Sequence, residues 1–310
     1  MVKGFFLLTL ILMFHQQAHC QAADSVVLPN AVLYYYLYGR GEPLILLSGG
    51  PGGSGHNMDH MVNELDKHYQ IVLFEQRGTG RSWTRPFDST TINLPQAVED
   101  LDQLRQKLQI SKLNLLGRSW GCMLATAYIS KYPNHVKLFI SVCGGGLDTS
   151  IMAPINTNAS ILARFYDHDS TRYRYWSNPA IMKMDSAKAI YELTRLHMFS
   201  RVYDSSKIDL VINRQRSQGP MNRKMARVMW ETLPKYLHFS TADPSFKGKV
   251  LLIFGWHDPV SLTTISQYMQ VFPHAEIYGV YGSGHFVETE RPDLFYPVVN
   301  NFLQKNVGTK

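Results

Sequence analysis

The feature that most constrains the fold is the stretch 117–121, which reads Gly-Arg-Ser-Trp-Gly and places a serine between two glycines. An apolar run, 113–116, precedes it, and a helix-like run, 122–131, follows it. A strand, a sharp turn and a helix in this order push the serine out of the sheet, and the turn leaves no room for a Cβ beside it. The following helix directs its N-terminus at any anion that forms there. The pattern indicates that Ser119 is a nucleophile; the alternative is a tight turn with an incidental serine.

Two further polar residues, Asp258 and His285, follow strand-like runs at 249–254 and 275–280. Because reactive residues of such folds gather at the carboxyl edge of a parallel sheet, we expect both to lie near Ser119. A base must take the serine proton before the hydroxyl attacks, so His285 is the candidate base and Asp258 the group that orients it. The alternatives are an ordinary loop histidine and an aspartate that only forms a turn.

Two acidic residues, Glu288 and Glu290, stand close behind His285 in the sequence. They follow it too closely to orient its ring from the opposite side. We therefore expect both carboxylates to be solvated or to cap a helix.

A glycine-rich loop, 47–55, follows the apolar run 44–47 and contains five glycines in nine residues. Glycine loses much entropy on ordering, so such a loop is not a packed element, and we expect its bare N–H groups to face a ligand. In a hydrolase with a serine elbow, this loop gives one oxyanion donor and the residue after the serine gives the other. This predicts an oxyanion hole made of the Gly50 and Trp120 N–H groups, with Gly49 as the fallback for the loop donor. The glycine spacings of phosphate-binding and dinucleotide-binding loops are absent.

Three segments together resemble the proline iminopeptidase family of α/β-hydrolases: 49–53, 75–82 and 118–121. The family pattern is His-Gly-Gly-Pro-Gly, then Asp-Gln-Arg-Gly-x-Gly-x-Ser, then Gly-x-Ser-Trp-Gly, and the order and approximate spacing agree. The resemblance covers about residues 25–145 and 246–305. It implies an α/β-hydrolase fold, with a mostly parallel sheet, helices on both faces and an inserted helical cap.

The sequence departs from the family pattern at two positions beside the glycine loop. Ser48 stands where the family has histidine, and Glu75 stands where it has aspartate. Neither belongs to the expected triad. The family's cap also carries carboxylates that hold the free amino group of the substrate, and the resemblance makes Glu192 and Glu231 the candidates here. A solvated helix face is the alternative for both.

The first twenty residues differ from the rest of the chain. Lys3 precedes an apolar run, 5–14, and polar and small residues follow it, which is typical of a secretory signal peptide. The apolar run is shorter than the roughly 20 residues that a membrane span needs. We therefore expect a secreted or periplasmic protein whose mature chain has no transmembrane segment. The expected organisation is a signal peptide at 1–20, a first core segment at 21–144, a helical cap at 145–245 and a second core segment at 246–310.

Strand-like and helix-like segments alternate through the two core segments, as in an α/β fold. Cys122 and Cys143 read as small buried residues, and a disulfide between them is left open. No Cys/His spacing indicates a metal site, and no motif indicates a cofactor. The expected strands are 30–38, 44–47, 71–74, 113–116, 136–142, 250–254 and 275–280, and the expected helices are 57–68, 94–108, 120–131 and 292–304.

The net charge is concentrated in one part of the chain. The whole chain has a net charge of +7, and 144–245 contains 14 basic and 9 acidic residues, a net +5. A basic cap repels the cationic amine of an aminopeptidase substrate unless a carboxylate lies nearby. The excess favours acidic substrates or an anionic envelope, or is a solvated surface. The basic residues form no nucleic-acid motif, so we expect a small molecule or short peptide as the partner.

These observations predict a serine hydrolase that works through an acyl-enzyme. The resemblance implies an aminopeptidase that releases an N-terminal residue, often proline, from small peptides. A carboxylesterase or lactonase with the same triad is the alternative, because the basic cap does not match the family. A ligand-binding protein that kept the fold without catalysis is a remote third.

Overall fold

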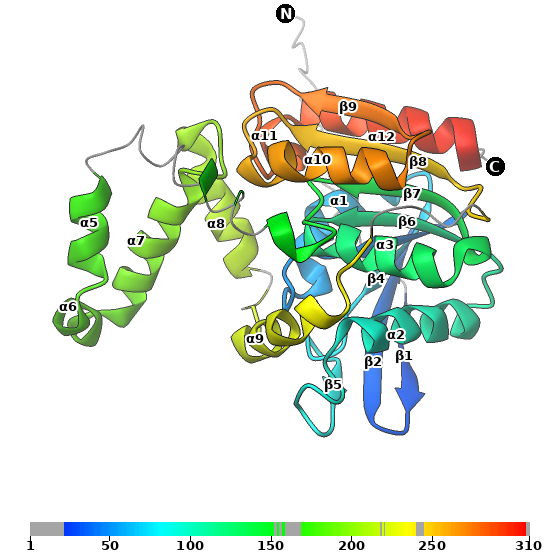
Figure 1. Cartoon of the computed structure of the whole chain (residues 1–310), viewed down its shortest axis with the longest axis horizontal. Helices are drawn as coiled ribbons and strands as arrows, with labels where there is room; N and C mark the ends of the chain where they lie inside the picture. The colour runs from blue at the N-terminus through cyan, green and yellow to red at the C-terminus, as the bar shows by residue number, and fades with distance from the viewer. Residues whose placement is uncertain are drawn as a thin grey trace, which may run out of the picture.

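The computed structural model describes residues 22–151, 154, 157–158, 169–217, 219, 221–239 and 245–307 (Figure 1). The expected signal peptide at 1–20 lies outside these residues, so the leader and the export of the protein stay predictions. Among the described residues, no helix combines the length and the apolar character that a membrane span requires.

A nine-stranded sheet forms the centre of the molecule. Its strands lie in the order β1-β2-β4-β3-β6-β7-β8-β9, and the short β5 pairs with β2. The pairs that involve β2 are antiparallel, and every pair from β4 to β9 is parallel. The parallel part therefore presents one common carboxyl edge. The strands are β1 (Ala22–Leu28), β2 (Ala31–Tyr38), β3 (Pro43–Leu47), β4 (Gln70–Phe74), β5 (Trp83–Thr84), β6 (Leu113–Arg118), β7 (Val136–Val142), β8 (Lys249–Gly255) and β9 (Glu276–Val280).

Helices cover both faces of this sheet (Figure 1). Successive side chains of a strand point to opposite faces, and both faces of β3 are buried. Ile45 and Leu47 belong to the core under α2, α3 and α10, whereas Leu44 and Leu46 belong to the core under α1 and α12. This arrangement confirms the predicted α/β-hydrolase fold. The core helices are α1 (Asp59–Leu65), which follows the 3₁₀ turn Gly55–Met58, α2 (Leu94–Lys107), α3 (Trp120–Lys131), which the 3₁₀ turn Pro133–His135 follows, α10 (Pro259–Val271), α11 (Val287–Glu290) and α12 (Pro292–Val307).

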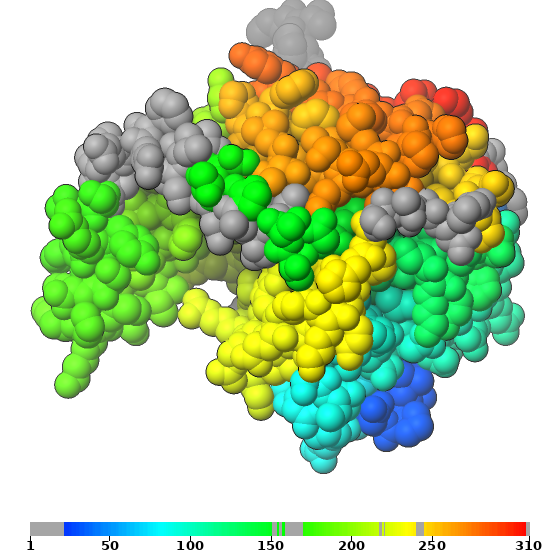
Figure 2. Space-filling model, in the orientation of Figure 1, coloured from blue at the N-terminus to red at the C-terminus, as the bar shows by residue number. Residues whose placement is uncertain are grey.

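The described residues between β7 and β8 form helices, turns and irregular loops, with one isolated bridge and no strand. Helices α5 to α7 project to one side of the core (Figures 1 and 2), while apolar residues of α9 belong to the core cluster. We call this helical insertion the cap; its limits at 145 and 245 stay predictions. Its helices are α5 (Asp169–Trp176), α6 (Pro179–Met184), α7 (Ser186–Met198), α8 (Ile208–Ser217) and α9 (Arg223–Thr232), with 3₁₀ turns at Thr149–Ile151, Ser205–Lys207 and Leu233–Lys235.

Besides the short β5 and α11, two longer elements of the core were not expected from the sequence. Strand β1 pairs along its whole length with β2, and α10 follows Asp258 directly. The sequence of α10 contains no charged residue, so it lacks the alternation of charged and apolar faces that identifies a surface helix. Cys122 and Cys143 are buried and not bonded to each other, which confirms their interpretation as small buried residues.

Candidate active site

The turn that carries the candidate nucleophile lies where β6 ends and α3 begins. Ser119 occupies the turn with φ of 51°, a conformation that is costly for a residue with a side chain. A Cβ on Gly117 would lie 2.7 Å from the carbonyl carbon of Gly121, and a Cβ on Gly121 would lie 2.0 Å from the Leu47 carbonyl oxygen. Both glycines are therefore required by close backbone packing, as the sequence pattern predicts.

Asp258 and His285 meet at the same edge of the sheet. Asp258 is fully buried at the start of α10, and its Oδ2 lies 2.8 Å from His285 Nδ1. Burial alone would raise the pKa of Asp258, but the charge of His285 and hydrogen bonds from His285, Ser261 and the Val260 N–H lower it below its usual range. Because Asp258 is thus ionised at neutral pH, it accepts the hydrogen bond and His285 Nδ1–H donates it. In the neutral form of the imidazole, the nitrogen that can accept a proton is then Nε2.

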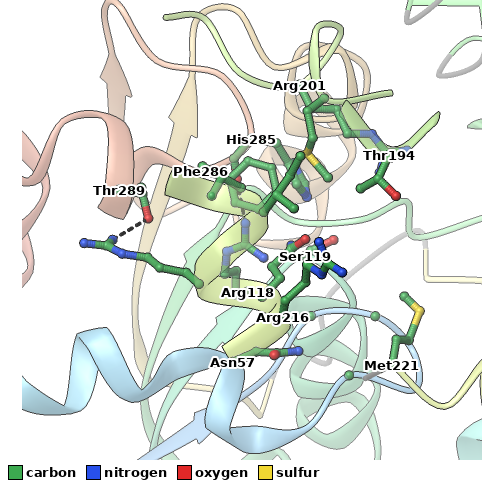
Figure 3. A pocket seen from close by; sticks show the side chains of 18 of the residues that line it. Asn57, Arg118, Ser119, Thr194, Arg201, Arg216, Met221, His285, Phe286 and Thr289 are labelled. Atoms are coloured by element: carbon green, nitrogen blue, oxygen red, sulfur yellow. Dashed lines mark hydrogen bonds between the residues drawn. The ribbon is translucent and has the colours of Figure 1, made fainter. Parts of the chain in front are cut away.

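Ser119 and His285 line one cavity of about 460 Å³ together with Gly49 and Gly50 (Figure 3). Within the described chain, the Ser119 hydroxyl makes no hydrogen bond, so its contact with His285 is not formed in this structure. Such contacts are often long without substrate and tighten when it binds.

The expected oxyanion donors are the backbone N–H groups of Gly50 and Trp120. Gly50 lines the cavity with φ of 142°, a conformation that favours glycine, and Trp120 is the first residue of α3. Neither N–H donates to another group in the described parts of the chain. Both are therefore available to a ligand.

A buried hydrogen-bond chain connects the glycine loop to the elbow. The Trp120 indole N–H donates to Gln76 Oε1 over 2.8 Å, and Gln76 Nε2 donates to the Ser48 carbonyl over 3.2 Å. The Ser48 hydroxyl donates to the Gly53 carbonyl over 3.1 Å. Ser48, which replaces the family's histidine, therefore fixes the loop from within.

Glu75, the second departure from the family pattern, holds the far end of the same loop. Its buried carboxylate accepts hydrogen bonds from Ser54 Oγ at 2.7 Å, the Gly55 N–H at 2.9 Å and Thr79 Oγ1 at 3.0 Å. Three donors compensate the buried charge. A glutamate thus fits this position without disturbing the loop.

The expectation that Glu288 is solvated or capping is wrong. Its side chain is buried, 3.0 Å from Arg118 Nε and 3.6 Å from His60 Nε2. Burial alone would raise the pKa of Glu288, but the Arg118 guanidinium and His60 lower it to about 2. Arg118 also donates to the His285 carbonyl over 3.1 Å, so this pair supports the loop of the candidate base.

The same expectation for Glu290 is also wrong. Its carboxylate is buried and accepts from the Gly284 N–H at 2.8 Å and the cap's Tyr203 N–H at 2.6 Å. Burial raises the pKa of Glu290 although these hydrogen bonds oppose the shift. The sequence does not show the backbone donors that make burial of this side chain possible.

The two cap glutamates proposed for substrate binding are not brought to the site. Glu192 pairs with Arg172 of α5 at 3.1 Å, and Glu231 is 67% exposed, 4.0 Å from Arg227 on its own helix. Neither is among the described residues that line the cavity. The cap helices turn them toward neighbouring arginines instead.

One group of side chains has the spacing of a metal site. Ligand atoms of Cys143, Asp258 and His285 lie within 4.8 Å of one another. Burial raises the pKa of the Cys143 thiol well above its usual range, so the thiol stays protonated, and a thiol binds metal as the thiolate. Since Asp258 and His285 already bond to each other, the trio does not suit a cation.

Arginines also line the cavity, and the sequence alone does not identify them as part of the site. Figure 3 shows three of them, Arg118, Arg201 and Arg216, around Ser119 and His285. The basic excess of the cap was the available signal, but it did not identify the residues that turn inward.

The chain is similar to known hydrolases over most of its length. Residues 42–292 match the family model described as the α/β hydrolase fold. The proline iminopeptidase of Heyndrickxia coagulans is 28% identical over 277 residues, which is 86% of this chain and 91% of that protein. The proline iminopeptidase-related protein of Thermus thermophilus superposes with a TM-score of 0.68 at 19% identity, covering 92% of this chain and 98% of that one. The proline iminopeptidase of Mycobacterium smegmatis gives 0.67 at 17% identity, with the same coverage.

Proposed function

Because the chain belongs to the α/β hydrolase fold family, we propose that it is a serine hydrolase with Ser119 as nucleophile, His285 as base and Asp258 as the orienting acid. The observation that carries the proposal is the 2.8 Å hydrogen bond between His285 and the buried Asp258, beside a cavity that Ser119 also lines. The strained turn at Ser119 supports it, because such strain at a serine elbow exposes the hydroxyl to substrate.

In this reaction, Ser119 Oγ forms a bond to the substrate carbonyl carbon while its proton moves to His285 Nε2. The carbonyl oxygen becomes an oxyanion that accepts hydrogen bonds from the Gly50 and Trp120 N–H groups. Collapse of this tetrahedral intermediate breaks the bond between the carbonyl carbon and the leaving group, and the leaving group takes the proton from His285. Water then attacks the acyl-serine ester, gives its proton to His285, and releases the acid as that proton returns to Ser119. Asp258 stabilises the imidazolium in both halves.

The test removes the nucleophile and leaves the elbow intact. Ser119→Ala should lower turnover by about three orders of magnitude or more, because the covalent route is lost. The control is Ser130→Ala. Ser130 lies on α3, the helix that begins directly after Ser119; its hydroxyl donates to the Thr126 carbonyl, and it lies outside the described cavity lining. Labelling with a fluorophosphonate probe, mapped by mass spectrometry, should place the adduct on Ser119. A folded protein that never labels would favour the non-catalytic, ligand-binding alternative.

The first candidate bond is the amide after the N-terminal residue of a small peptide. Its support is the similarity to proteins named proline iminopeptidase. This activity needs a carboxylate for the substrate ammonium. The one carboxylate among the described cavity residues, Glu288, is already paired with Arg118.

The second candidate bond is a carboxylic ester or lactone, and the charge of the cavity favours it. Such substrates have no ammonium group, so the arginines do not repel them. Comparing proline arylamide with a short-chain aryl ester separates the candidates. Ester turnover without arylamide cleavage would exclude the peptidase activity. Efficient arylamide cleavage would exclude ester hydrolysis as the main activity.

A further inference from the structure

The cavity beside Ser119 is strongly basic. Five arginines and one carboxylate are among the described residues that line it. Two of the arginines are engaged: Arg118 with Glu288 at 3.0 Å, and Arg214 with Thr289 Oγ1 at 2.9 Å. The other three are Arg201, Arg216 and Arg223, all from the cap.

These three guanidinium groups make no hydrogen bond to any described residue, and the three arginines are exposed. Each guanidinium donates up to five hydrogen bonds and stays charged at any relevant pH. The cavity therefore offers positive charge and donors that its own described residues do not neutralise.

The structure places all three of these arginines at the wall of the cavity. The Arg201 carbonyl accepts the His285 N–H at 2.6 Å, so the Cα of Arg201 is tied to the loop of the candidate base. The Arg216 guanidinium lies 5.4 Å from the centroid of the Tyr191 ring, and Tyr191 also lines the cavity. Arg223 is the first residue of α9, behind the side-chain cap of Asn222.

We propose that Arg201, Arg216 and Arg223 form a subsite for a carboxylate, and that the substrate is an ester or amide whose acyl chain ends in one. The inference rests on the proposed serine hydrolase function for the bond that is cleaved. A guanidinium matches a carboxylate in charge and geometry, and a charge-assisted hydrogen bond in a partly enclosed cavity is stronger than a neutral one.

The size of the cavity and its apolar residues indicate what the substrate contains besides the carboxylate. The volume of about 460 Å³ is that of a small-molecule site. Apolar side chains lie beside the arginines and suit a short hydrocarbon chain between the reacting carbonyl and the carboxylate. They are Met58, Ile190, Met198, Val211, Ile212, Met221 and Phe286.

The test compares two esters that differ in one charge. Mono-4-nitrophenyl glutarate carries a terminal carboxylate, and 4-nitrophenyl pentanoate has an acyl chain of the same length without it. We expect kcat/KM to be about tenfold or more higher for the glutarate ester, as one charged hydrogen bond provides. The advantage should shrink as salt rises, because exposed charges are screened.

Variants assign the effect to the subsite. Arg201→Gln, Arg216→Gln and Arg223→Gln should each reduce the preference for the charged ester, and the triple variant should abolish it. Arg227→Gln is the matched control: it changes an arginine of α9 that is 69% exposed, faces Glu231 and lies outside the described lining. A triple variant that keeps the wild-type preference would overturn the proposal.

A binding measurement separates this proposal from the proposed reaction. Calorimetry on Ser119→Ala protein should show glutarate binding, no binding of the neutral glutaramide, and loss of glutarate binding in the triple arginine variant. Glutarate binding by a protein that hydrolyses neither ester and never labels would keep the subsite and refute the serine hydrolase. Equal turnover of both esters through Ser119, with no glutarate binding, would refute the subsite and keep the hydrolase.

Discussion

Arg118 stands immediately before Ser119, the candidate nucleophile, and connects three parts of the site. Its guanidinium pairs with Glu288, donates to the His285 carbonyl and lies 4.4 Å from the centroid of the Phe286 ring. A buried charge is costly without a partner, so Arg118 and Glu288 depend on each other. Their pairing holds the segment that follows His285 against the elbow.

The ion pair of Glu288 makes the stability of the folded protein depend on pH. Its pKa of about 2 in the folded protein lies below the ordinary 4.5, so its stabilising contribution is complete above pH 4.5 and is lost as the pH falls toward 2. Glu288→Gln should lower the free energy of unfolding at pH 7 by about 3 kcal/mol, because it leaves Arg118 without its counter-charge. Between pH 6 and pH 3, the variant should lose about 2 kcal/mol less stability than the wild type.

Urea unfolding followed by tryptophan fluorescence at the three pH values measures these differences. Glu64→Gln is the control, since Glu64 is half exposed and pairs with the exposed Lys67. It should match the wild type at each pH. If Glu288→Gln and the wild type lose equal stability on acidification, the carboxylate of Glu288 does not carry this contribution.

Single residues differ in how far the sequence predicts their position. Ser119, Asp258 and His285 each follow an apolar strand, so their shared edge follows from sheet geometry. Glu288 and Glu290 could not be placed, because their burial depends on donors that are distant in sequence. A charged residue beside the candidate nucleophile, Arg118, is the one signal in the sequence for a buried counter-charge.

At the scale of elements, the elbow depends on how closely α3 approaches β3. A methyl group on Gly121 would lie 2.0 Å from the Leu47 carbonyl oxygen, so Gly121→Ala must push the helix away from the strand. We expect it to destabilise the fold by about 3 kcal/mol and to reduce activity, since overpacking displaces the backbone that carries Ser119. Thermal and urea unfolding, with Ser130→Ala of the same helix as control, measure the effect. A Gly121→Ala protein with wild-type stability and turnover would contradict the tight approach.

The elements that the sequence predicted correctly each carry a recognisable local pattern. Buried parallel strands read as short apolar runs, and α2 and α3 fall within a residue of the expected limits. Strand β1 was missed because its first four residues are small or polar and exposed or half-buried, so no apolar run or alternation marks this edge strand. Helix α10 was missed because an uncharged helix has no contrast between its faces.

At the scale of the whole molecule, the cap and the loop of the candidate base are joined. The His285 N–H donates to the Arg201 carbonyl, and the Glu290 carboxylate accepts from both Gly284 and Tyr203. An apolar cluster of Met198, Val202, Ile208, Val211, Ile212 and Phe286 packs beside these bonds. The cap therefore positions the loop of the candidate base as well as covering the cavity, a coupling that no local pattern in the sequence shows.

This coupling gives the last prediction. Glu290→Ala removes the acceptor that both N–H groups share, and a displacement of His285 by about 1 Å can cost on the order of 10²-fold in rate. We therefore expect kcat/KM and the rate of fluorophosphonate labelling at Ser119 to fall together by about that factor, although the variant keeps both Asp258 and His285. Asp293→Ala is the control, because Asp293 is 60% exposed and bonds to Arg291 outside the cavity. If Glu290→Ala keeps the wild-type labelling rate, the cap does not position the base, and its contacts with this loop serve stability alone.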